Sequence, residues 1–301
     1  MRGPGSKAER RVPGAPRLTV ERRLPRPLDW SRTSAYLAWL FIGLYWVAIL
    51  QHGSGADARV LHAAWDGPMY GETWHQFGYV FSPAFAQITY PLTLLPFGVY
   101  FALLATANIA AVVWCAGPRL GALLLVTPPV VAEIALGNIN ILLGAAIVLG
   151  FRHPSAWAFV LLTKVTPGVG LLWFVFRRKW RDLGIALGTT AAIVAVSAAL
   201  APNLWTIWIE RLAASSSLGP NPTAIVLLDL PLTVRLTIGA ALIAVAAWKG
   251  WRWLALLSAF IAQPAVTMQR TSMLVAAIRL FGHPSILRRT ADHLRSQSGQ
   301  H

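Results

Sequence analysis

Charged side chains are scarce in this sequence, and acidic side chains are the scarcest of all. Asp, Glu, Lys and Arg make up 12% of the 301 residues, and only 11 residues are Asp or Glu. A typical soluble domain carries about 25% charged residues. Hydrophobic residues account for 56% of the chain. Such long apolar runs with so little charge exclude an ordinary soluble domain and predict a polytopic membrane protein.

Cysteine is almost absent, since Cys115 is the only one. One thiol excludes an internal disulfide and any metal site built from several cysteines. The sequence also lacks an HExxH motif and an acidic DxD pair. His52, His62 and His75 are better explained as solvated loop residues than as metal ligands. We therefore expect no metal and no other cofactor.

The basic residues outnumber the acidic ones and give the chain a net charge of +15. Membrane topology explains this excess better than nucleic-acid binding does, because Lys and Arg gather on the cytoplasmic side of membrane proteins. With both ends of the chain assigned to the cytoplasm, only five basic residues fall on the outer side, and all others fall inside. These five are Arg59, Lys164, Arg211, Arg235 and Arg270.

Three regions are expected along the chain. Residues 1–33 form a basic, disordered cytoplasmic tail, residues 34–282 a transmembrane catalytic domain, and residues 283–301 a second cytoplasmic tail. The central region predicts an all-α bundle of roughly 8–10 membrane helices, some of them short or broken. Residues 201–221 are expected to form an outer loop. The apolar segments are 34–50, 81–96, 97–116, 120–136, 141–151, 155–176, 183–200, 236–248, 253–268 and 271–281.

The loop at 51–79 follows the first apolar segment and carries Asp57, Asp66 and Glu72. A carboxylate next to a membrane span is a candidate for function. We expect Asp57 to act as a general base, with Asp66 or Glu72 as the replacement if Asp57 does not. The alternative for Asp57 is an ordinary solvated loop residue.

The run at 155–176 contains Lys164 and Pro167 near its middle. Basic residues flank both ends of this run, so a single helix would begin and end on the same side of the membrane. A proline interrupts a helix, and a lysine at membrane depth needs water or a partner. We therefore expect two short helices that meet near Lys164, either on the outer side or in a cavity open to it. The alternative is a lysine that snorkels to the interface without a ligand.

The same count of spans places Asp57, Asn138, Asn140, Lys164 and Arg270 on one face of the membrane. Lysine and arginine suit a phosphate, and amides suit sugar hydroxyls. We therefore assign Lys164 and Arg270 to a donor phosphate, and Asn138 and Asn140 to a sugar. The alternative for 137–140 is a simple turn with amide caps. On the acceptor side the candidates are Asp66, Tyr79 and Trp205, although Trp205 is also typical of an interface anchor.

Several short motifs occur in an order that resembles a known family. They are Gly55-Ala56-Asp57, the segment from Tyr79 to Pro83, Leu94-Leu95-Pro96, Gly137-Asn138-Ile139-Asn140, Lys164 with Pro167, and the basic stretch at 177–181. Over about residues 34–281 the chain resembles the polyprenol-phosphate-mannose-dependent α-1,2-mannosyltransferases of actinobacteria, glycosyltransferase family 87 in the GT-C membrane class. It departs from the family pattern at Asn138, at the lysine–proline spacing and at Gln269-Arg270.

The resemblance implies transfer of a hexose, mannose or a related sugar, from a polyprenyl phosphate to a glycolipid or lipoglycan on the outer face of the cell membrane. It implies no nucleic-acid partner and contact with membrane lipids. The rival hypothesis is a transporter or flippase for a lipid-linked or anionic solute, although no internal repeat supports it. A third is an inactive relative that serves as an assembly partner.

Overall fold

The computed structural model describes residues 40, 55–71, 79–215, 226–228 and 230–281. The two expected tails, nearly all of the expected span at 34–50, and Glu72 lie outside the described residues. Within them the chain is almost entirely helical. This confirms the prediction of an all-α bundle.

In the described part of the chain, three helices are long and apolar enough to cross a membrane: α5 (Phe97–Leu124), α10 (Trp180–Leu200) and α12 (Leu232–Lys249). Two shorter helices, α6 (Pro128–Leu136) and α7 (Asn140–Gly150), meet at a bend of 104° and would make a fourth crossing as a broken span. At 1.5 Å per residue, a helix of about 20 residues matches the hydrocarbon core of a bilayer. The protein is therefore a polytopic membrane protein with long and broken helices.

The other elements are shorter. The α-helices are α2 (Ala56–His62), α4 (Pro83–Thr93), α8 (Trp157–Thr163), α9 (Leu172–Phe176), α11 (Pro202–Ser215), α13 (Arg252–Ile261) and α14 (Ala277–Phe281). The 3₁₀ segments are η1 (Ala63–Trp65), η2 (Pro154–Ala156), η3 (Thr166–Leu171) and η4 (Gln269–Ala276).

Three expected segments differ from the observed ones. The run at 120–136 is divided, because α5 kinks at Gly117 (φ 77°), resumes at Pro118 and ends at Leu124, and Pro128 can only begin a new helix. The expected loop at 201–221 contains helix α11, whose more buried side chains, among them Leu204 and Trp208, share one helical face. The run at 253–268 stops being helical at Ile261, shortly before Pro264.

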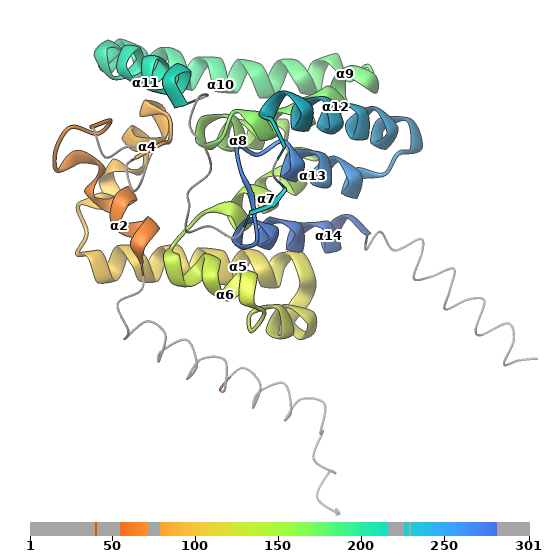
Figure 1. Ribbon diagram of the computed structural model, residues 1–301, viewed down its shortest axis with the longest axis horizontal. Coiled ribbons are helices and arrows are strands. Elements are labelled where there is room, and N and C mark those ends of the chain that lie inside the picture. Colours follow the sequence, from red (N-terminus) through yellow and green to blue (C-terminus); the bar gives the residue numbers. More distant parts are fainter. Residues whose placement is uncertain (1–39, 41–54, 72–78, 216–225, 229, 282–301) are drawn as a thin grey trace, which may run out of the picture.

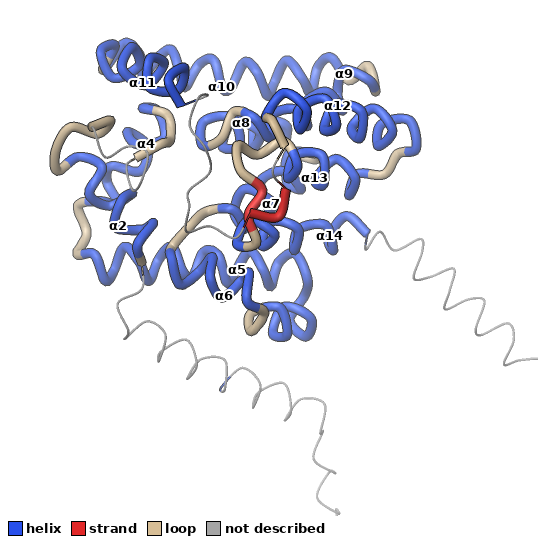
Figure 2. Tube along the Cα trace, in the orientation of Figure 1, coloured by secondary structure: helices blue, strands red, loops and turns tan. Residues whose placement is uncertain are grey.

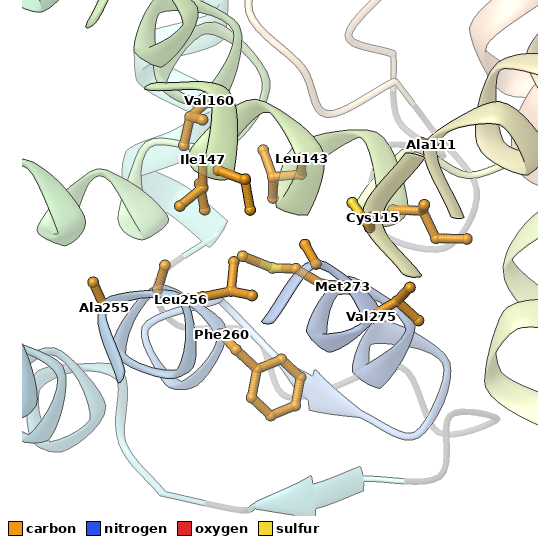
Figure 3. Packing of buried hydrophobic residues seen from close by; sticks show 14 of the residues in the cluster. Ala111, Cys115, Leu143, Ile147, Val160, Ala255, Leu256, Phe260, Met273 and Val275 are labelled. Carbon is orange, nitrogen blue, oxygen red and sulfur yellow. The ribbon is translucent and has the colours of Figure 1, made fainter. Parts of the chain in front are cut away.

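Figure 1 shows α10 and α11 along one side of the molecule and α5 and α6 along the opposite side, with α7, α8 and α13 between them. The main core lies in this middle layer. In Figure 3, Leu143 and Ile147 of α7 face Leu256 of α13 and Met273 of η4, and all four side chains are fully buried. This packing fixes η4 against the bent α6–α7 pair.

Two short strands appear in Figure 2, β1 (Val226–Leu228) and β2 (Val266–Thr267), and they pair antiparallel. Arg235 of α12 holds the turn that leads into β2. Its guanidinium donates to the carbonyl oxygen of Gln263 and, at 2.8 Å, to that of Pro264. These contacts fix the backbone just before Gln269 and Arg270, the first residues of η4.

Candidate functional site

The site is built on the turn that joins α6 to α7. Helix α6 ends at Gly137, which takes a left-handed conformation with φ 72° that favours glycine. The N–H of Asn138 donates to the carbonyl oxygen of Glu133 at 3.0 Å and closes the last turn. The bend brings Asn140 back to Glu133 of α6 and leaves Asn138 beside α2.

Helix α2 packs directly on this turn. The N–H of Gly55 donates to the carbonyl oxygen of Ala135 at 2.7 Å, and Ala58 lies so close to Gly137 that a side chain there would overlap it. This docking brings Asp57 to Asn138, whose Nδ2 donates to Asp57 Oδ2 at 2.6 Å. Asp57 was expected in a loop, but it lies in the first turn of a helix, where the helix dipole favours a carboxylate.

Asn140 begins α7 and continues the hydrogen-bond chain. Its Nδ2 donates to Glu133 Oε2 at 3.0 Å, its backbone N–H donates to Glu133 Oε1, and its Nδ2 also lies 3.3 Å from Asn138 Oδ1. Its Oδ1 accepts a hydrogen bond from Lys164 Nζ. Asp57, Asn138, Asn140 and Lys164 therefore form one connected chain, which we call the amide relay.

Lys164 lies where the expected long apolar run is broken. Helix α8 ends at Thr163, Lys164 has an extended backbone, and η3 begins at Thr166. The prediction that the run divides at Lys164 is confirmed. The end of α8 is also fixed to the start of α4, because Ser82 Oγ donates to the carbonyl oxygen of Leu162 at 2.7 Å.

Arg270 lies in the same electrostatic environment as the relay. The negative charges of Asp57 and Glu133 attract its guanidinium, and its own positive charge repels that of Lys164. Its Nη1 donates to the carbonyl oxygen of Ala265 at 2.6 Å, which fixes the guanidinium. The neighbouring Gln269 donates from Nε2 to Glu133 Oε2 at 3.2 Å. Four of the five residues that the sequence placed on one face are therefore joined by hydrogen bonds, and Arg270 lies within electrostatic range of them next to Gln269.

The relay leaves hydrogen-bonding capacity free for a ligand. Within the described part of the chain, Asp57 Oδ1 accepts no hydrogen bond, and Lys164 Nζ has one acceptor although an ammonium has three protons. Arg270 uses one of its five N–H groups in the same residues. The site therefore offers a carboxylate oxygen that can take a proton, next to two cations that can hold an anion.

Glu133 is the important residue that the sequence reasoning missed. It is fully buried in α6, and its carboxylate accepts from Asn140 and Gln269. The signal was present in the sequence, because a glutamate inside an apolar segment is a functional candidate in a membrane protein. Sequence reasoning considered only the carboxylates of the loop that follows the first span.

The three acceptor-side candidates do not join the relay within the described residues. Asp66 is exposed at the end of η1. Trp205 donates to Ser197 Oγ at 3.0 Å and packs against Trp208 on α11, as an interface anchor would. Tyr79 is buried among aromatic side chains, and its hydroxyl has no partner among the described residues. Burial raises the pKa of Tyr79 well above its ordinary value, so the hydroxyl stays protonated.

Among the described residues, no group of three or more His, Cys, Asp or Glu side chains could hold a metal ion. The carboxylates of Asp57 and Glu133 are instead hydrogen-bonded by amides. The described residues of this site therefore suit proton transfer and binding of an anion.

Comparison with known proteins places the chain in a family. A family model for glycosyltransferase family 87 matches residues 79–281, which include Glu133, Asn138, Asn140, Lys164 and Arg270 and begin after Asp57. No curated protein and no solved structure matched. The match covers more than half of the chain and agrees with the apolar helical bundle. The chain therefore belongs to glycosyltransferase family 87 and is a membrane glycosyltransferase.

Proposed function

We propose that the protein moves a hexose, with mannose as the expected sugar, from a polyprenyl phosphate to a hydroxyl of a glycolipid or lipoglycan. The proposed side is the outer face of the membrane. The observation that carries the proposal is the amide relay, which joins Oδ2 of Asp57 to the ammonium of Lys164 through Asn138 and Asn140 and leaves Oδ1 of Asp57 free within the described residues.

The proposed chemistry is a single displacement. The acceptor hydroxyl attacks the anomeric carbon, its proton passes to Asp57, and the bond between the anomeric carbon and the phosphate oxygen breaks. Lys164 and Arg270 hold the departing phosphate through charge-assisted hydrogen bonds. Asn138, which is partly exposed, binds a sugar hydroxyl and holds Asp57. Asn140 was also expected to bind the sugar, but it is fully buried and both of its amide protons are bonded, so it holds Lys164 instead.

The charge balance of this step supports the assignment. The donor phosphate is a diester with one negative charge, and the product is a monoester that gains a second negative charge as the ester bond breaks. Asp57 loses its negative charge when it takes the proton, so the total charge of the site does not change. Two cations and two carboxylates surround the reaction, which limits the cost of developing charge away from water.

Purified protein in liposomes, supplied with a radiolabelled polyprenyl-phosphate hexose and a lipid acceptor, tests the proposal. Covalent transfer of the label to the acceptor supports the glycosyltransferase. Movement of the labelled lipid across the bilayer without transfer supports the flippase instead. Binding of the labelled lipid with neither result supports an inactive assembly partner.

A further inference from the structure

Glu133 neither takes a proton nor binds the donor in the proposed chemistry, yet it is the most buried charged group in the described site. Its side chain is 0% exposed, and both carboxylate oxygens accept hydrogen bonds. The donors are the backbone N–H and the Nδ2 of Asn140, and the Nε2 of Gln269 at 3.2 Å. An ionised carboxylate accepts only, so this side chain suits three converging donors.

The contact with Glu133 decides which way the amide of Asn140 faces. An amide has a donor end and an acceptor end, and Glu133 can bind only the donor end. The oxygen of Asn140 is therefore turned toward Lys164, which can bind only an acceptor. Reversing the amide would place its NH₂ group against the ammonium and would leave Lys164 without this partner.

We infer that Glu133 is a positioning residue that sets the polarity of the amide relay and thereby holds Lys164 ready for the donor phosphate. The identity of the phosphate rests on the proposed function, whereas the orientation of the amide does not. Glu133 acts through Asn140, and Gln269 ties the same carboxylate to η4, the segment that carries Arg270. One buried carboxylate thus contacts the partner of Lys164 and the residue before Arg270.

The inference predicts a specific pair of compensating substitutions. Glu133→Gln supplies an NH₂ group where Asn140 also donates, so the Asn140 amide turns and its NH₂ faces Lys164. Asn140→Asp places a second carboxylate against Glu133. In the double variant the new glutamine donates to the new aspartate, whose other oxygen still accepts from Lys164, so the contact that holds Lys164 is restored. The link from residue 140 to Asn138 is not restored, because an aspartate has no proton to donate to Asn138 Oδ1.

The test uses full-length protein in detergent and measures two quantities for both single variants and the double variant. One is the thermal unfolding midpoint without substrate. The other is the KM for polyprenyl-phosphate hexose, set against the KM for the acceptor. Each single variant should lower the midpoint and raise the donor KM about 10- to 100-fold, the scale of one lost hydrogen bond to a charged group, with the acceptor KM unchanged. The double variant should recover most of both losses.

Ser258→Ala is the matched control, because Ser258 is fully buried and its hydroxyl donates to the Gly239 carbonyl oxygen at 2.7 Å, away from the relay. It should lower the midpoint and leave the donor KM unchanged. A double variant no better than the worse single variant, or a Glu133→Gln protein with wild-type donor KM, would overturn the inference. If wild-type protein transfers no sugar, the proposed function fails, and recovery of the midpoint alone decides the role of Glu133.

Discussion

Asn138 donates a hydrogen bond of 2.6 Å from Nδ2 to Oδ2 of Asp57 and leaves Oδ1 free within the described residues. The carboxylate is therefore held by one oxygen and open at the other. Asp57→Asn keeps an acceptor for Asn138 and removes the base. Loss of a general base costs roughly 10²–10⁴-fold in rate, so we expect that loss in kcat of sugar transfer with normal membrane insertion.

Asp66→Asn is the control for this variant, because Asp66 is exposed and lies outside the relay. Its transfer rate should match that of the wild type. A near-wild-type rate in Asp57→Asn would show that another group takes the proton. Combining each substitution with donor-binding measurements separates a chemical defect from a binding defect.

Lys164 should contribute to donor binding more than to the fold. In Lys164→Met the contact with Asn140 and the charge facing the phosphate are both lost, so the donor KM should rise about 10- to 100-fold. Membrane insertion should be intact or improved, because a lysine at the centre of a span costs about 2.5–3.5 kcal/mol on insertion scales.

Lys164→Arg keeps the charge but replaces a compact ammonium with a larger planar group. We expect impaired transfer here too, with a donor KM between those of the wild type and Lys164→Met. An unchanged donor KM in the methionine variant would return Lys164 to the role of a snorkelling residue. Arg270 would then be the remaining cation for the phosphate.

Gly137→Ala should damage both stability and activity. The left-handed backbone costs a side-chain-bearing residue about 1–2 kcal/mol, and the added Cβ would overlap Ala58 and push α2 away from the turn. Gly250→Ala is the matched control, because Gly250 has φ 75° at the end of α12 and an added Cβ there meets nothing within 4 Å. Both variants should lower the thermal midpoint, but only Gly137→Ala should lose transfer.

Thiol labelling of single cysteines can determine on which side of the membrane each loop lies. In a background without the buried Cys115, a cysteine at Gly67 should react with an impermeant thiol reagent in intact cells, since 51–79 is expected outside. A cysteine at the exposed Ser155, next to Arg152 and His153, should react only after the cells are opened. The opposite pattern would place the site on the cytoplasmic side.

Sequence reasoning located the relay because its members are conspicuous in an apolar chain. Lys164 is a charge within a long apolar run, and Asn138 and Asn140 follow a glycine that ends a helix. It failed where tertiary contacts decide the outcome. Asp57 becomes helical because α2 docks on Ala135 and the turn, and the chain after α13 continues into β2, which pairs with β1. Neither contact is local in the sequence.

The partners of Glu133 also set an order for assembly during synthesis. Asn140 follows seven residues later, so the carboxylate can find its first donors while α6 and α7 are still the newest part of the nascent chain. Gln269 comes 136 residues later, after α8 to α13 have been made. A ribosome stalled before η4 would therefore leave a bundle whose buried carboxylate has two of its three donors, a state that quality-control proteases could recognise as an unfinished chain.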